Sequence, residues 1–218
     1  MTPESFLDAL YRHRAVAILR AQHTARAAAA MDAAVGAGFR VLEFTITTPG
    51  AFDLIAEFSR RPDLVVGAGT VIDIAGVEAA VGAGAKFLVS PVYDKAVVSA
   101  ARELDVPVLP GCFTPTEMLA AHRAGATCLK LFPSPGDIAG FVRSVLGPLP
   151  FLKIVPTNGV HAGNAAEVLA AGAAGVGFTT SLFDPSEVEA RRLDSINERA
   201  HELLVAVKHF TGAKRPHK

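Results

Sequence analysis

The chain has 218 residues, half of them hydrophobic, and its 21 basic and 21 acidic residues leave a formal net charge of zero, which argues against a nucleic-acid partner. Its two cysteines, Cys112 and Cys128, lack the spacing of a metal site and are too few for a disulfide framework. No apolar run approaches the roughly 20 residues of a membrane helix, and no secretory signal opens the chain, so we expect a cytoplasmic protein without a membrane partner.

Residues 2–12 predict a helix, and after it one short unit repeats along the chain. Each unit is an apolar, β-branched run followed by a turn, an Ala-rich amphipathic stretch and a Gly-Ala connection. The runs begin about 20 to 25 residues apart, the spacing of successive βα units. They lie at residues 15–19, 40–45, 64–68, 86–90, 106–110, 127–132, 151–155 and 174–178. A last helix is expected over residues 185–208.

Eight strands that alternate with helices allow a closed barrel or a doubly wound sheet. The units are even in size and no GxGxxG motif follows the first strand, which favours the barrel. The predicted fold is a single α/β domain over residues 1–218, a (β/α)8 TIM barrel with residues 2–12 as an extra N-terminal helix at its bottom. In this fold the active site lies at the carboxyl ends of the strands, so polar residues late in each run are the candidates.

Two charged residues interrupt strands that should be apolar on both faces. Lys130 lies between Leu129 and Leu131, and Glu43 lies in the run 40–45. Because side chains alternate along a strand, apolar neighbours that face the helices would turn both charged groups into the barrel. Burial would lower the pKa of Lys130 and supply a neutral amine for attack on a ketone, with Glu43 moving protons. A structural ion pair between the two residues is the competing interpretation of the same geometry.

Two other lysines compete for the role of nucleophile. Lys153 precedes Pro156 by the spacing that separates Lys130 from Pro133, and periodicity does not fix its depth in the barrel. Lys86 begins its strand, so it is expected near the opposite face and is the weaker candidate.

The loops after the last two strands predict an anion site. These loops are the usual phosphate site of a (β/α)8 barrel, where backbone N–H groups and hydroxyls face the ligand. Ordinary turn and capping chemistry explains the same residues. The residues are Thr157, Asn158 and Gly159 in the first loop, and Thr179, Thr180 and Ser181 in the second.

Residues that end two earlier strands suggest a second anion contact. Arg20 closes the first strand and Thr70 closes the third, so together they could hold a carboxylate at the mouth. A metal mechanism has little support, because no HxH or HExxH occurs and His161 alone lies near the expected mouth. We expect no metal and no cofactor.

Six motifs follow one another in a specific order. They are Val41-Leu42-Glu43, Gly67-Ala68-Gly69-Thr70-Val71, Ser90-Pro91, Pro110-Gly111-Cys112, Leu129-Lys130-Leu131-Phe132-Pro133 and Pro156-Thr157-Asn158-Gly159-Val160. With them the chain, from about Ala15 to Phe183, resembles the bacterial 2-keto-3-deoxy-6-phosphogluconate aldolases, together with relatives acting on the 6-phosphogalactonate epimer and on 4-hydroxy-2-oxoglutarate.

This resemblance implies a (β/α)8 barrel, commonly a homotrimer, that uses no metal in the chemical step. It implies that Lys130 is the Schiff-base lysine, ahead of Lys153, and that Glu43 is the general acid–base. The remaining implied contacts are Thr70, Pro91 and Phe132 around the pyruvate half of the site, and Gly159 and Ser181 near the substrate phosphate.

The sequence departs from the gluconate-type pattern at three places. The arginine that this pattern places late in the second strand, on the keto-acid carboxylate, is Thr47 here, and Thr47 is predicted to bind substrate in its place. Arg20 matches the carboxylate arginine of the galactonate-type relatives, so the carboxylate contact could come from the first strand. The Gly-Gly pairs of the two anion loops are Asn158-Gly159 and Thr179-Thr180. Phosphate would then bind through threonine hydroxyls, or the substrate is unphosphorylated.

The predicted function is therefore cleavage of a small 2-keto acid. The favoured substrate is a 6-phosphorylated 2-keto-3-deoxy sugar acid, which gives pyruvate and an aldehyde such as glyceraldehyde 3-phosphate. An unphosphorylated 2-keto acid such as 4-hydroxy-2-oxoglutarate is the first alternative. A phosphate-binding isomerase or epimerase with Glu43 as base is the second, and a metabolite-binding barrel without catalysis is the third.

Overall fold

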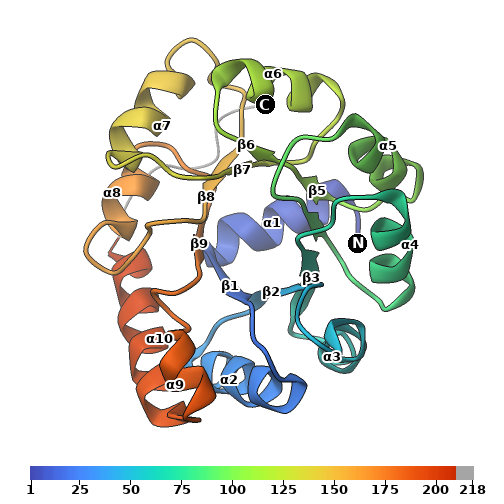
Figure 1. Ribbon diagram of the computed structural model, residues 1–218. Helices are drawn as coiled ribbons and strands as arrows, with labels where there is room; N and C mark the ends of the chain where they lie inside the picture. Colours follow the sequence, from blue (N-terminus) through green and yellow to red (C-terminus); the bar gives the residue numbers. More distant parts are fainter. Residues whose placement is uncertain (210–218) are drawn as a thin grey trace.

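A computed structural model describes residues 1–209, so residues 210–218 of the predicted domain lie outside the described residues. Short strands surround a common axis and helices cover them on the outside (Figure 1). The strands are β1 Ala15–Leu19, β2 Val41–Thr45, β3 Val65–Gly69, β4 Leu88–Val89, β5 Val108–Leu109, β6 Gly111–Cys112, β7 Leu129–Leu131, β8 Ile154–Pro156 and β9 Val176–Phe178. The helices are α1 Pro3–His13, α2 Thr24–Ala37, α3 Ala51–Phe58, α4 Ile74–Gly82, α5 Lys95–Glu103, α6 Pro115–Arg123, α7 Ile138–Leu146, α8 Ala165–Ala170, α9 Pro185–Glu189 and α10 Leu193–Lys208.

The strands form two sheets, ordered β5-β4-β3-β2-β1-β9 and β6-β7-β8, in which every pair is parallel. The α/β fold with a curled parallel sheet that the sequence predicts is thus confirmed. Each predicted run contains a strand, but the run at 106–110 continues beyond its proline as a separate strand. Pro110 has no N–H to donate, so the ladder breaks there into β5 and β6.

Backbone hydrogen bonds also join the segments that border the two sheets. The Ala174 N–H, just before β9, donates to the Ile154 carbonyl of β8 at 2.8 Å. The Lys130 N–H of β7 donates to the Pro110 carbonyl, between β5 and β6, at 3.0 Å.

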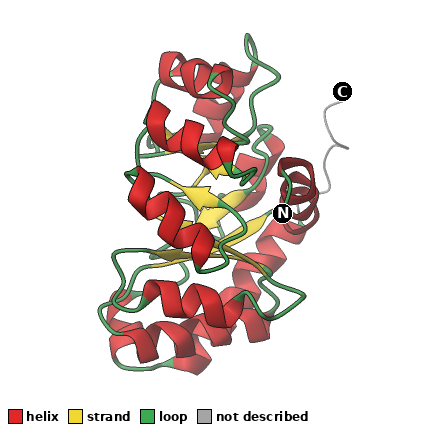
Figure 2. Cartoon of the chain, turned by 90° about the vertical axis from the view of Figure 1, so that its right-hand side faces the viewer, coloured by secondary structure: helices red, strands yellow, loops and turns green. Residues whose placement is uncertain are grey.

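The helices lie outside the strands (Figure 2). Buried apolar side chains form two layers, one between the strands and these helices and one on the inner side of the curled sheets. Leu42, Phe44, Leu129 and Leu131 belong to the outer layer, as the alternation of side chains predicts. The inner layer takes residues of opposite parity, among them Val41, Cys128 and Val155. Glu43 on β2 and Lys130 on β7 share this parity, so their side chains are directed inward.

Helix α1 confirms the helix predicted at residues 2–12. Thr2 caps it, since its hydroxyl accepts the Ser5 N–H at 3.3 Å, and Pro3 occupies the first turn. Phe6 and Leu10 are fully buried in the inner layer, and the Phe6 ring lies 4.9 Å from the Phe87 ring. The helix thus packs against the inner side of the curled sheet.

The single helix predicted over residues 185–208 is wrong, because the chain forms α9 and α10 there instead. Asp184 caps α9 by accepting the N–H groups of Ser186 and Glu187. Arg191 has a positive φ of 55°, which a continuous α-helix does not allow. Among residues 1–209, no helix combines the length and the apolar character that a membrane span requires.

Candidate active site

A cleft of about 360 Å³ opens at the carboxyl ends of the strands. Its lining comes from residues late in, or just after, β1, β2, β3, β4, β7, β8 and β9. It brings together ten of the residues predicted from the sequence: Lys130, Glu43, Arg20, Thr70, Pro91, Phe132, Thr157, Asn158, Thr179 and Thr180. The other lining residues are Ile18, Thr45, Phe183 and Pro185.

Lys130 projects into this cleft from the middle of β7. It is only 8% exposed, and its Nζ lies 4.9 Å from the centre of the Phe132 ring. The two adjacent leucines anchor the strand against the helices, so the long lysine side chain has only the interior to enter. An amine held in this way is shielded from bulk water but open to a ligand in the cleft.

The carboxyl group of Glu43 is the second charged group in the cleft. Glu43 is 2% exposed, and burial raises its pKa, while the nearby positive charges of Lys130 and Arg20 oppose that rise. Its Oε1 is buried and has no hydrogen-bond partner among the described residues. A carboxyl group with a raised pKa can both take up and release a proton during a reaction.

Arg20 and Thr70 meet at the mouth of the cleft. The Arg20 Nη2 donates to the Thr70 Oγ1 at 3.3 Å. Thr70 has a φ of 64°, a left-handed conformation that is costly for a β-branched residue. Strain of this kind persists when the surroundings hold the residue in place, and it is concentrated at functional sites.

Three residues predicted to bind substrate are not part of the cleft lining. Thr47 is exposed, and its hydroxyl donates to the Thr45 Oγ1 at 3.2 Å. Gly159 has a φ of 77°, and its carbonyl accepts a hydrogen bond from Asn164. The hydroxyl of Ser181 is buried and has no hydrogen-bond partner among the described residues.

Some lining residues that were not predicted could have been found from side-chain alternation. Thr45 lies two residues after Glu43 on the same face of β2, and Ile18 of β1 lies two residues before Arg20. Phe183 and Pro185 carried no such signal, since Phe183 lies between β9 and α9 and Pro185 is the first residue of α9.

Strand register places Lys130 and Lys153, the two candidate nucleophiles, at different depths. Lys130 pairs with Val155 across β7 and β8, so Lys153 lies two residues, or about 7 Å, toward the amino ends of the strands. It does not line the cleft, and its charge acts instead on Cys128 and His122. Lys86 lies near the amino ends, as expected, in a pocket with Met1.

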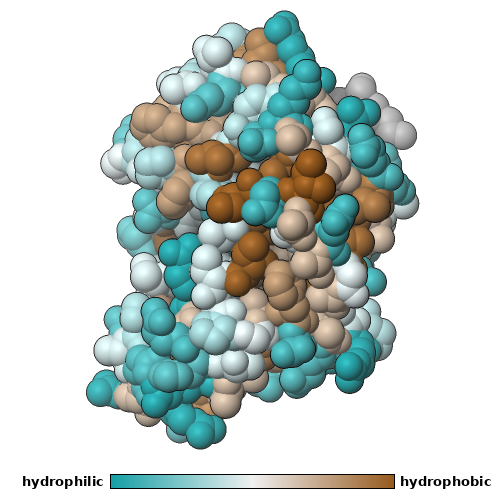
Figure 3. Space-filling model, turned by 45° about the vertical axis from the view of Figure 1, so that its right-hand side comes forward, coloured by the Kyte–Doolittle hydropathy of each residue, from teal (hydrophilic) through white to brown (hydrophobic). Residues whose placement is uncertain are grey.

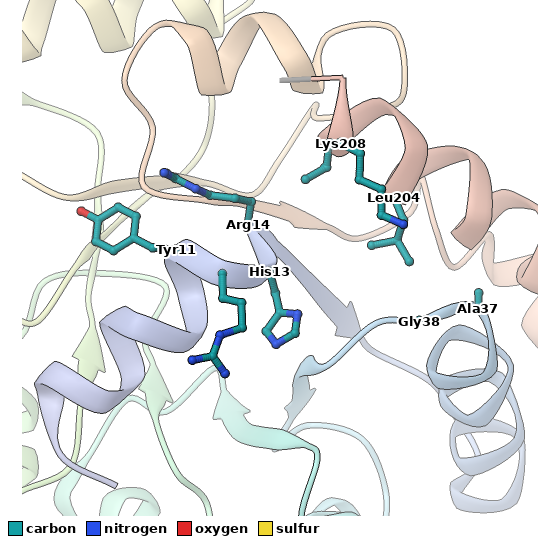
Figure 4. A pocket seen from close by; sticks show the side chains of 9 residues that line it. Tyr11, His13, Arg14, Ala37, Gly38, Leu204 and Lys208 are labelled. Atoms are coloured by element: carbon teal, nitrogen blue, oxygen red, sulfur yellow. The ribbon is translucent and has the colours of Figure 1, made fainter. Parts of the chain in front are cut away.

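A second pocket, of about 390 Å³, lies at the amino ends of the strands (Figure 4). Arg12 and Lys208 lie in the last turns of their helices, where positive charge offsets the negative end of the helix dipole. Arg14 extends toward Tyr11, 4.7 Å from its ring centre, and away from Lys208. Among the described residues the lining of this pocket includes no carboxylate, so the pocket lacks the pair of a lysine and a glutamate that the cleft contains. Within residues 1–209, no group of three or more His, Cys, Asp or Glu residues could hold a metal.

Comparison with known proteins gives the class of the protein. The chain is 34% identical to the probable 2-dehydro-3-deoxy-6-phosphogalactonate aldolase of Rhizobium meliloti, over 78% of this chain and 82% of that one. It is 30% identical to the KHG/KDPG aldolase of Escherichia coli K12, over 81% and 84%. The fold and these relatives define the chain as an aldolase, a carbon–carbon lyase.

Similar solved structures and a match to a sequence family show which family of aldolases the chain belongs to. A native KDPGal structure covers 90% of this chain and 95% of its own, with a TM-score of 0.83 and 28% identity. KDPG aldolase from Legionella pneumophila, with pyruvate captured as a covalent carbinolamine, covers 93% and 98%, with a TM-score of 0.82 and 25% identity. The sequence model of KDPG and KHG aldolases matches residues 7–199. The chain belongs to the KDPG and KHG aldolase family.

Proposed function

We propose that this chain is a class I aldolase that cleaves a 6-phosphorylated 2-keto-3-deoxy sugar acid to pyruvate and glyceraldehyde 3-phosphate. The observation that carries the proposal is the pair of buried charged groups, Lys130 and Glu43, in one cleft at the carboxyl ends of the strands. A relative of this fold holds pyruvate as a covalent carbinolamine, the adduct that a primary amine forms with a ketone.

The reaction begins with the substrate carboxylate on Arg20 and Thr70. The amine of Lys130 attacks the C2 ketone, and Glu43 protonates the departing hydroxyl, so that water leaves and an iminium forms. Glu43 then takes the proton of the C4 hydroxyl. The C3–C4 bond breaks, its electron pair moves into the iminium to give an enamine, and the aldehyde departs. Protonation of the enamine and addition of water release pyruvate and restore Lys130.

Borohydride trapping with pyruvate, followed by peptide mapping, tests this mechanism. We expect one reduced adduct, on Lys130, and none in Lys130→Met. Lys153→Met is the matched control and should retain the adduct, because Lys153 lies deeper than the cleft. An adduct on Lys153, or none on any lysine, would contradict the assignment. Turnover that survives borohydride in the presence of substrate would favour an isomerase or epimerase instead.

The lining residues that follow β8 and β9 indicate whether the substrate carries a phosphate group. Thr179 and Thr180 follow β9 and line the cleft with Asn158, so they offer hydroxyl and amide donors to a phosphate. The lining supplies no lysine or arginine besides Arg20 and Lys130, and this favours 4-hydroxy-2-oxoglutarate or another unphosphorylated 2-keto acid as a second candidate. Cleavage kinetics on the two phosphorylated epimers and on 4-hydroxy-2-oxoglutarate distinguish these substrates. The highest kcat/KM for a phosphorylated acid supports the first candidate.

We also propose that the strands complete an eight-position barrel with α1 across its lower end, and that the protein is a homotrimer. The hydrogen bonds of Ala174 and Lys130 across the sheet borders support closure. Apolar side chains gather on the side formed by α4 and α5 (Figure 3), and Ile72 and Val92, in the loops before these helices, are 57% and 55% exposed. Exposed apolar surface of this kind favours self-association. Sedimentation should give the mass of three chains, and Val92→Glu should reduce it.

A further inference from the structure

We propose that the hydroxyl of Thr45 donates a hydrogen bond to the carboxylate of the bound 2-keto acid, as a third contact beside Arg20 and Thr70. The inference rests on the proposed function and adds a substrate-binding residue that the sequence did not reveal. Thr45 is the last residue of β2, is 4% exposed and lines the cleft. It lies about 7 Å nearer the mouth than Glu43, on the same face of the strand.

The position of Thr45 brings it to the carboxylate side of the cleft. In the β2–β3 register Thr45 pairs with Gly69, the residue immediately before Thr70. Thr70 in turn accepts the Arg20 hydrogen bond. Thr45, Thr70 and Arg20 therefore end three adjacent strands, β2, β3 and β1, around one part of the lining.

The hydroxyl of Thr48 bears on whether Thr45 donates or accepts in the hydrogen bond between them. Thr48 is 2% exposed. Its Oγ1 accepts the Ala21 N–H at 3.2 Å and lies 3.2 Å from the Thr45 Oγ1. The structure gives the Thr48 hydroxyl no other acceptor among residues 1–209. Either hydroxyl could be the donor of this pair. Thr45 lines the cleft and Thr48 does not, so an acceptor on a bound ligand can reach only Thr45. With such a ligand, donation from Thr48 to Thr45 leaves neither buried hydroxyl without an acceptor.

The Thr45 oxygen thus accepts twice, from Thr48 and from Thr47. A hydroxyl group has two lone pairs and one hydrogen, so both of its acceptor positions are filled and only its hydrogen remains. No described residue accepts that hydrogen, and the side chain faces the cleft. Thr47, which was predicted to bind substrate, acts through Thr45 in this arrangement.

A carboxylate is the ligand group that matches these donors. The oxygen of Thr70 accepts from Arg20, so its hydrogen is also available, and the guanidinium of Arg20 supplies further N–H groups. Two carboxylate oxygens provide about four acceptor positions, whereas a ketone or a single hydroxyl provides fewer. Thr48 also binds the backbone next to Arg20, so one network fixes two of the three donors.

Binding of pyruvate and of its uncharged amide, measured by calorimetry, tests the inference. Thr45→Val removes the hydroxyl at nearly constant volume and should weaken pyruvate binding about 10-fold, the effect of one hydrogen bond to a charged group. It should weaken binding of the amide less, because the amide carbonyl is a neutral acceptor, and Thr45→Ser should restore pyruvate binding. Thr24→Val is the matched control, because the Thr24 hydroxyl binds the Pro49 carbonyl outside the cleft lining. It should alter neither ligand.

Unchanged pyruvate binding in Thr45→Val, or an equal loss for pyruvate and its amide, overturns the inference. If Thr45→Val does not fold, as judged by its thermal transition, Thr45→Ala and Thr45→Ser provide the same comparison. Borohydride trapping in the wild-type protein separates this result from the proposed function. Pyruvate binding that depends on Thr45 but yields no adduct supports the carboxylate contact and refutes the aldolase, whereas no pyruvate binding at all refutes both.

Discussion

Gly69 leaves open the space that the carboxyl group of Glu43 occupies, since a Cβ at residue 69 would overlap with Oε1 of Glu43. Glu43 pairs with Gly67 in the β2–β3 register, so its side chain leans two residues toward the mouth of the cleft. The missing side chain at Gly69 therefore determines where the carboxyl group lies. Gly69 does not line the cleft, so it acts as a positioning residue.

We expect Gly69→Ala to displace Glu43 and to lower kcat about 100-fold, the usual effect of moving a catalytic group by roughly 1 Å. Gly82→Ala, at the end of α4, is the matched control because an added Cβ there meets no atom within 4 Å. Steady-state cleavage kinetics and a thermal transition for each variant check the prediction. A folded Gly69→Ala protein with the kcat of the wild type would show that Glu43 tolerates displacement.

Replacing Glu43 by glutamine should raise thermal stability while it slows catalysis. Burial raises the pKa of Glu43 above its ordinary value near 4.5, so the folded state binds this proton more tightly than the unfolded state does. The resulting stabilisation is fully present below the unfolded pKa and is lost as the pH rises through the folded pKa. Glutamine does not titrate and avoids that loss.

The difference in Tm between Glu43→Gln and the wild type, measured from about pH 4 to about pH 8, checks this sign. The advantage of Glu43→Gln should grow as the pH rises above the ordinary carboxyl range and then become constant. An advantage that shrinks over that range would mean that the carboxylate is stabilised in the fold, contrary to its burial.

Thr70→Gly should leave stability about unchanged and should weaken pyruvate binding. The left-handed backbone of Thr70 costs about 1 kcal/mol, which glycine relieves and which offsets the 0.5 to about 1 kcal/mol that a new glycine usually costs. Thr116→Gly, at an exposed position in α6, relieves no strain. It should therefore lose the full 0.5 to about 1 kcal/mol of stability that a new glycine costs. Urea denaturation and pyruvate calorimetry check both expectations. An equal loss of stability in the two variants would exclude strain at Thr70.

Arg20→Gln should raise the KM for the keto acid about 10-fold or more, with a smaller effect on kcat, because in the proposed mechanism the guanidinium binds the substrate carboxylate and does not act on the C3–C4 bond. Arg143→Gln is the matched control, since Arg143 lies on the surface and pairs with Glu167 at 3.6 Å. Initial-rate kinetics separate the two constants. A large fall in kcat at constant KM would place Arg20 in the chemical step instead.

Much of this protein can be read from local patterns in its sequence. The alternation of side chains in Leu129-Lys130-Leu131 placed the two leucines against the helices and the lysine inside, as the two apolar layers confirm. The regular spacing of the runs located the strands, and the position of Arg20 and Thr70 at strand ends located the cleft. These features depend on a residue and its near neighbours, so the sequence is sufficient for them.

Other features depend on how separate strands align, which no local pattern contains. Lys130 and Lys153 stand at the same distance from a proline, and only the pairing of Lys130 with Val155 shows that Lys153 lies deeper. The proposed role of Thr45 as a donor depends on the hydrogen bonds of Thr48 with Ala21 and with Thr45. The first of these joins the segments that follow β1 and β2, which are far apart in the sequence. Register and hydrogen-bond direction are set by the packing of the whole sheet, and for that reason the tertiary structure alone decided them.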